Sequence, residues 1–105
     1  MKRLNNITPG EILQEEFLTP MDISQYRLAK ELGISQTRIS SIINGSRRIT
    51  ADTALRLSSF FGNSAKFWLG LQDDFDIENT KETYQSVYQR IRKVDFTRRR
   101  QVEFA

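Results

Sequence analysis

The sequence predicts an all-α protein: five short helices around one small core, followed by a C-terminal extension. Three observations support this prediction. Apolar residues recur three and four positions apart between residues 8 and 75, and nowhere there do they alternate with polar residues as in a strand. Residues that cap helices precede each apolar segment. The length of 105 residues suits a single domain.

The first helix is expected over about 9–18. Thr8 and Glu11 form the pattern of a capping box, in which each side chain accepts a backbone N–H of the other residue. Pro9 fits the first helical position, because the N–H that proline lacks has no helical partner there. A turn that contains Pro20 should end the helix.

Four further helices are expected, each preceded by a serine or threonine that can cap its first turn. The expected ranges are 25–32, 36–44, 51–61 and 65–74, capped by Ser24, Ser35, Thr50 and Ser64. Gly33, Gly45 and Gly62 should end three of them, because glycine adopts the left-handed conformation without a clash at Cβ. These helices make up an expected domain over 1–76, with a helix-turn-helix at 24–44.

Residues 77–105 are expected to form an extension. The polar stretch 76–79 predicts a joint, and an amphipathic helix is expected over about 80–94, followed by a mobile basic end. Its apolar stripe consists of Tyr84, Val87, Tyr88 and Ile91. Three interpretations of this stripe remain open: docking on a partner protein, folding back on the body, and pairing across a dimer.

Composition excludes several classes of function. The chain contains no cysteine and no histidine, so disulfides, thiolate metal sites and the commonest proton carrier are missing. The carboxylates at 73–78 have no base or nucleophile beside them, and a solvated linker is favoured over a weak metal site. We therefore expect no enzymatic activity, no cofactor and no metal. No apolar run approaches ~20 residues and no signal peptide is evident, which predicts a cytoplasmic protein without membrane contact.

Positive charge is concentrated in two stretches, although the net charge is only +3. Residues 81–105 carry seven Lys or Arg against three Asp or Glu. Between residues 24 and 48, five basic residues accompany one acidic residue, Glu31. A local basic patch on a nearly neutral body fits a polyanionic partner, and on charge alone a scattered solvated face fits equally well.

The stretch 24–44 carries the functional prediction. Two short helices joined by a tight turn are expected there, with small Ala29 at the helix crossing and Ile39 and Ile42 holding the second helix on the body. The opposite side of that second helix carries short amides and hydroxyls. Such groups exchange hydrogen bonds with base edges in the major groove. The sequence therefore predicts a DNA-binding helix-turn-helix whose second helix reads DNA.

The expected DNA-binding residues lie on this second helix or beside it. Those of the helix and its two ends are Ser35, Gln36, Thr37, Arg38, Ser40, Ser41 and Asn44. Gln25 and the helix N-termini should meet phosphates, because unpaired backbone N–H groups and the helix dipole favour anions. Arg47 and Arg48 follow the helix and are placed for the DNA backbone. For any one of these residues, ordinary solvent exposure is the alternative.

The segment Ser24–Gln36 resembles the phage-repressor-like, Xre-type helix-turn-helix family, and the chain more narrowly resembles the HigA antitoxins. The narrower resemblance rests on Pro9-Gly10-Glu11-Ile12-Leu13, on Asn44-Gly45, on the run from Arg47 to Leu57, and on Phe67-Trp68-Leu69 with Leu71-Gln72. It implies a lambda-repressor-like domain and a homodimer on a palindromic operator of double-stranded DNA. It also implies neutralisation of a HigB-type mRNA-cleaving toxin, and cooperation of Gln25 with Gln36 at the operator.

The resemblance further implies a dimer surface on the fifth helix. The residues concerned are Phe67, Trp68, Leu71 and Phe75, for which ordinary core packing is an equal alternative. The extension departs from the family pattern, since many relatives end soon after the position of Phe75, and its apolar stripe is a possible toxin contact. The alternative function is a solitary repressor without a toxin, in which the extension serves only to dimerise.

Overall fold

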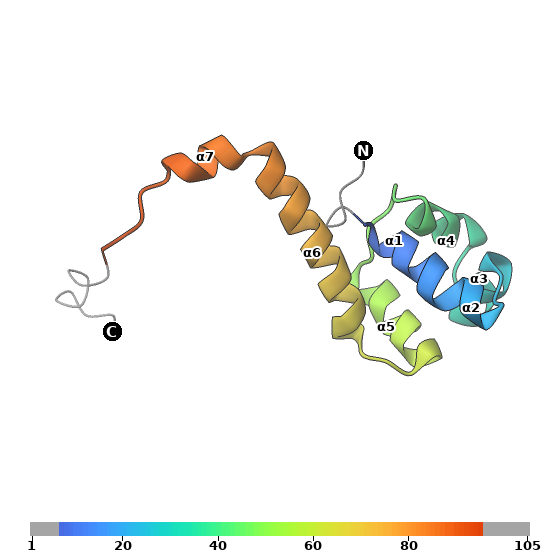
Figure 1. The fold of residues 1–105 in the computed structure, drawn as a ribbon. Helices are drawn as coiled ribbons and strands as arrows, with labels where there is room; N and C mark the ends of the chain where they lie inside the picture. Colours follow the sequence, from blue (N-terminus) through green and yellow to red (C-terminus); the bar gives the residue numbers. More distant parts are fainter. Residues whose placement is uncertain (1–6, 96–105) are drawn as a thin grey trace, which may run out of the picture.

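The computed structural model describes residues 7–95, and within that range the chain contains helices and no strand. The prediction of an all-α fold is therefore confirmed. The first helices and the beginning of the helix over residues 65–83 pack into one body, from which the rest of that helix and the last helix lead away (Figure 1). None of the helices between residues 7 and 95 has the length and apolar character needed to cross a bilayer.

A continuous helical rod opens the fold. It consists of α1 (Pro9–Ile12), the π-helical segment η2 (Leu13–Leu18) and α2 (Thr19–Met21). The capping box is confirmed, because Thr8 Oγ1 accepts from the Glu11 N–H at 3.1 Å and Glu11 Oε1 accepts from the Thr8 N–H at 3.0 Å. The expected end at residue 18 is wrong. Pro20 lies within this rod, near the start of α2, without ending it, and Asp22 ends the rod with a φ of 57°.

The next three helices lie close to their expected ranges. They are α3 (Gln25–Leu32), α4 (Gln36–Ile43) and α5 (Ala51–Phe61). Ser24, Ser35 and Thr50 each accept a hydrogen bond from the backbone N–H three residues later. The positive φ values of Gly33 and Gly62 confirm the left-handed helix ends that the sequence predicted.

The core lies where these helices meet. Its buried apolar side chains include Leu13, Leu18, Leu28, Ile39, Ile42, Ile49, Leu57 and Trp68. Trp68 is fully buried, packs against Phe17 with ring centroids 4.8 Å apart, and donates from Nε1 to Asn63 Oδ1 at 2.9 Å. Ala29 is 3% exposed where α3 packs on α4, as its small size predicts.

The C-terminal helices differ from expectation. α6 (Ala65–Thr83) continues far past residue 74, so the predicted joint at 76–79 is wrong. The polar residues there weaken a helix only slightly, and neither glycine nor proline interrupts it after Gly70. The predicted division into 1–76 and 77–105 remains a prediction, although α6 passes through that boundary without a break.

The predicted helix over 80–94 is wrong in its bounds. Residues 80–83 belong to α6, and after a break at Tyr84 the short α7 (Gln85–Arg90) is followed by Ile91, whose backbone is extended. Side chains from 81 to 95 are exposed, so this stretch lacks the packing that stabilises an amphipathic helix. Figure 1 shows α7 directed away from the helical body, so the alternative in which it folds back on the body is not realised.

Candidate nucleic-acid interface

Helix α4 has one buried side and one exposed side. Ile39 and Ile42 are 0% and 1% exposed, and Ile43 packs partly buried against the same core. On the other side Gln36 and Thr37 are exposed, and Ser40 and Ser41 are half-buried. The helix therefore turns its isoleucines toward the body and an uncharged hydrogen-bonding surface toward solvent.

Gln25, at the start of α3, is hydrogen-bonded on both sides of its amide. Its Nε2 donates to Gln14 Oε1 at 3.2 Å, and its Oε1 accepts from the Ser40 hydroxyl at 3.1 Å. These bonds join the N-terminal rod, α3 and α4 at the candidate DNA surface. Since Ser40 donates its hydrogen to Gln25, only lone pairs of its hydroxyl remain to accept from a DNA base. Within residues 7–95 no hydrogen bond joins Gln25 to Gln36.

Asn44 and Ser35 serve as caps of α4. Asn44 Oδ1 accepts from the Ser46 N–H at 2.9 Å and from the Ser46 hydroxyl at 2.7 Å. The Asn44 amide N–H groups thus remain to donate, while its oxygen is occupied by the turn that leads to Gly45. Ser35 Oγ accepts from the Arg38 N–H at 3.1 Å. Both residues stay exposed at the edge of the α4 surface.

Arg38 is turned into the protein. Its Nη2 donates to Asp52 Oδ2 at 3.0 Å and to Thr53 Oγ1 at 2.6 Å, which ties α4 to α5. Its Nε is buried without a hydrogen-bond partner, and its side chain is 24% exposed. Its guanidinium is thus engaged with α5, a partner distant in sequence, and the expectation that Arg38 binds DNA stays a prediction.

Asp52 accepts hydrogen bonds from two arginines, Arg38 and Arg56. Hydrogen bonds from Arg38 and then Arg56 hold the pKa of Asp52 below its usual value. Arg56 Nε donates to Asp52 Oδ2 at 2.9 Å, and Arg56 Nη1 donates at 2.7 Å to the carbonyl of Leu32 at the end of α3. Asp52 thus links α5 to α4 directly, and to α3 through Arg56.

This lowered pKa gives a pH dependence of stability. A carboxyl whose pKa is lower in the folded than in the unfolded chain stabilises the fold above its unfolded pKa, and that contribution disappears as the pH falls through the folded pKa. Asp52→Asn should therefore melt at a lower temperature than the wild type at neutral pH, and the difference should shrink as the pH falls below the ordinary pKa of an aspartate. Thermal unfolding at several pH values checks this, and a difference that stays constant with pH would contradict it.

Arg47 and Arg48 differ in their surroundings. Both side chains are exposed, but Arg48 also forms an ion pair with Asp76 of α6. The other Asp76 oxygen accepts from Gln72 Nε2 at 3.1 Å, and Gln72 Oε1 accepts from the Ile49 N–H at 2.8 Å. Gln72 is buried, and it satisfies a buried backbone group of the segment between α4 and α5. Gln72 belongs to the family pattern found in the sequence, but its role as the partner of the Ile49 N–H was not predicted.

Gly10 is a second residue whose role was missed. A Cβ built on it would lie 2.0 Å from the Ile42 carbonyl oxygen and 2.8 Å from Ile43 Cα. The backbones of α1 and α4 therefore touch at this point, which fixes the position of the candidate reading helix. A signal was present in the sequence, because glycine is a poor helix former and Gly10 falls within the expected helix over 9–18.

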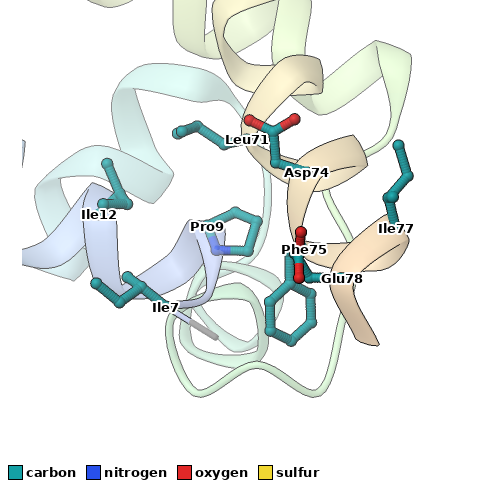
Figure 2. A pocket seen from close by; sticks show the side chains of 8 residues that line it. All are labelled: Ile7, Pro9, Ile12, Leu71, Asp74, Phe75, Ile77 and Glu78. Carbon is teal, nitrogen blue, oxygen red and sulfur yellow. The ribbon is translucent and has the colours of Figure 1, made fainter. Parts of the chain in front are cut away.

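A groove of about 410 Å³ lies between α1 and α6, away from the exposed side of α4. Figure 2 shows apolar side chains from both helices around it, with Pro9 between the two helices, and the lining also includes Asp74 and Glu78. Two of the expected dimer residues, Leu71 and Phe75, thus line one groove, and Phe67 is 39% exposed on the same helix. Trp68 has no exposed surface and belongs to the core, so its expected dimer role is corrected.

The apolar stripe of the extension is exposed. Tyr84, Val87, Tyr88 and Ile91 retain between 41% and 67% of their accessible surface. Tyr84 and Tyr88 pack edge to face with centroids 6.4 Å apart. Tyr88 also closes a hollow of about 340 Å³ beside Ile77 and Lys81 of α6. Exposed apolar side chains thus lie on the end of α6, on α7 and just after it, with polar residues such as Thr80 and Lys81 among them.

The acidic residues of α6 form no metal centre in the described part of the chain. Between residues 7 and 95 no group of three or more acidic side chains is arranged to hold a metal ion. Asp76 is instead the partner of Arg48 and Gln72. The exposed groups on α4 and beside it are hydrogen-bonding side chains such as Gln36 and Thr37, and the charged side chain of Arg47.

Comparisons with known proteins also identify a helix-turn-helix in this chain. A family model described as helix-turn-helix matches residues 14–68. Virulence-associated protein I of Dichelobacter nodosus is 48% identical over 77% of this chain and 75% of its own length, and antitoxin HigA-1 of Vibrio cholerae is 38% identical over 75% and 74%. The solved Pseudomonas aeruginosa antitoxin HigA with the higBA promoter is 35% identical, covers 86% of this chain and 99% of its own, and has a TM-score of 0.81.

Proposed function

Because the chain belongs to the Xre-type helix-turn-helix family of HigA antitoxins, we propose that it represses its own operon as the antitoxin of a type II toxin–antitoxin pair. The observation that supports the proposal is the uncharged, exposed side of α4, whose opposite side buries Ile39 and Ile42 in the core. Gln36 and Thr37 are the proposed base-reading residues, since amides and hydroxyls match the donors and acceptors of the major groove. Arg38 is left out of this set because Asp52 and Thr53 hold it.

The remaining DNA contacts are proposed to go to phosphates. The first turns of α3 and α4 present backbone N–H groups, and Gln25 lies at the start of α3. Ser41 and Asn44 border the same surface, and Arg47 follows it. Contacts of this kind position the protein without reading sequence.

Arg47→Ala is expected to weaken binding to every DNA sequence alike, and to lower the slope of log affinity against log salt by about one. Arg48→Ala is the matched control. Its guanidinium is already paired with Asp76, so its removal should change the slope less. Titration of labelled duplexes at several salt concentrations measures both slopes. A larger change for Arg48→Ala than for Arg47→Ala would reverse the assignment.

A homodimer is proposed to form on the palindromic operator, through the groove between α1 and α6. Leu71 and Phe75 line that groove, and Phe67 is exposed at the N-terminal end of α6. Apolar side chains such as these suit the centre of an interface between two copies of the chain. Sedimentation of Leu71→Asp should show a monomer where the wild type is a dimer.

The toxin partner, a HigB-type mRNA-cleaving protein, is proposed to dock on the apolar stripe of the extension. Tyr88 lies on α7 and Ile91 directly follows it, and exposed apolar side chains of this kind can dock in an apolar groove of a partner. Replacement of both by glutamate should abolish copurification of the neighbouring operon product. Gln85→Glu with Gln89→Glu adds the same charge on the same helix outside the stripe and should leave copurification intact. Unchanged copurification in the first variant would exclude a stripe-borne site, and the lack of any toxin gene would leave a solitary repressor.

The family is a class of DNA-binding regulators rather than of enzymes. We accordingly propose that the chain performs no catalysis and needs no cofactor. Its proposed target is operator DNA, which places its action in the cytoplasm of a bacterial cell.

A further inference from the structure

We propose that Gln14 is a positioning residue of the DNA-binding surface, which orients Gln25 through a chain of hydrogen bonds that begins at Thr19. The proposal rests on the proposed function, because it concerns how the same surface meets operator DNA. Gln14 itself is half-buried on η2, outside the helix-turn-helix, and it has no place in the DNA-binding set derived from the sequence.

The chain of bonds has a fixed direction. Gln14 Nε2 donates to Thr19 Oγ1 at 3.0 Å, and Gln14 Oε1 accepts from Gln25 Nε2 at 3.2 Å. Gln25 Oε1 in turn accepts from the Ser40 hydroxyl at 3.1 Å. An amide has two N–H donors, so Gln25 keeps one N–H for DNA after the bond to Gln14. With its nitrogen and its oxygen both engaged, the Gln25 amide cannot rotate without the loss of a hydrogen bond.

The π-helical segment η2 makes the first bond of the chain possible. Residues five apart in an α-helix point in directions that differ by about 140°. A π-helix closes its backbone bonds over five residues, and the Thr19 N–H donates to the Gln14 carbonyl in this way. The same register brings the two side chains within hydrogen-bond distance. The wide turn thus aims the Gln14 amide at Gln25, and π-turns are often found at functional sites.

Ordering Gln25 before DNA arrives removes an entropy loss from the binding step. Gln14→Leu keeps the size of the side chain and removes both of its hydrogen bonds. We expect this variant to bind operator DNA about threefold to tenfold more weakly than the wild type, the loss that corresponds to one neutral hydrogen bond or one ordered side chain. Thr19→Val, at an exposed position, should give a smaller loss in the same direction.

A double-mutant cycle tests the proposal, with the full chain and a fluorescently labelled operator duplex. Gln14→Leu, Gln25→Ala and the double variant are titrated by anisotropy, and the melting temperature of each is recorded. If Gln14 acts through Gln25, its substitution has no further effect in the Gln25→Ala background, whereas a purely structural or direct contribution of Gln14 persists there. Thr19→Val is measured in both backgrounds, so the result does not depend on one variant.

The outcomes separate the two levels of inference. A wild-type protein that fails to bind the operator overturns the proposed function. A wild-type protein that binds, with losses for Gln14→Leu and Gln25→Ala that add in the double variant, overturns the positioning role alone. If Gln14→Leu binds the operator with wild-type affinity, the positioning role alone is likewise overturned. A loss that vanishes in the Gln25→Ala background, at an unchanged melting temperature of Gln14→Leu, establishes the positioning role.

Discussion

Replacement of Gly10 by alanine is expected to lower the free energy of unfolding by about 3 kcal/mol. The added methyl group would meet the Ile42 carbonyl oxygen at 2.0 Å and Ile43 Cα at 2.8 Å, and both belong to backbone that cannot rotate away. α1 and α4 would have to separate. Because α4 carries the candidate DNA surface, operator binding should fall together with stability.

Gly70→Ala is the matched control for this experiment. Gly70 also lies inside a helix, α6, but a Cβ on it would meet no atom within 4 Å. Alanine there should leave stability unchanged or raise it by up to about 1 kcal/mol, the difference in helix propensity. Urea unfolding of both variants measures the contrast. Equal stability of Gly10→Ala and the wild type would mean that α1 and α4 are not in backbone contact.

Alanine at Gln36 and Thr37 is expected to remove sequence preference. Each substitution should weaken operator binding by roughly 1–3 kcal/mol, the usual contribution of a good base contact, while affinity for unrelated DNA changes little. Both side chains are exposed on α4 and neither supports the core, so the melting temperature should stay near that of the wild type.

Thr80→Ala with Gln85→Ala is the matched control for that pair. These positions carry the same two side-chain types, also exposed, on α6 and α7 outside the helix-turn-helix. Operator affinity should not change in this control. Competition between specific and unrelated duplexes gives the ratio for each variant. If the α4 variants kept the wild-type ratio, another part of the surface would have to read the bases.

Local signals in the sequence sufficed for much of the fold. Serine and threonine caps and the glycines at 33 and 62 marked the helix ends, because capping depends on residues within one turn. The spacing of Ile39 and Ile42 sufficed to orient α4, since a helix buries residues three and four apart on one side. The exposed position of Gln36 follows from that orientation.

Partners that are distant in sequence escaped prediction. Arg38 reads as a surface cation until Asp52, fourteen positions later, is seen to hold it. Gln72 reads as an ordinary helical glutamine until the Ile49 N–H is placed against it. The prediction of a joint at 76–79 gave too much weight to the polar character of these residues, since no glycine or proline is present there to end α6.

The central claim is that the exposed side of α4 reads DNA as a symmetric pair. Footprinting of the purified protein on the DNA upstream of its own gene tests this most directly. We expect two protected half-sites related by a two-fold axis, with centres about one helical turn, ~34 Å, apart. Uniform cleavage along that DNA, at protein concentrations and salt where specific regulators of this size bind, would contradict the claim.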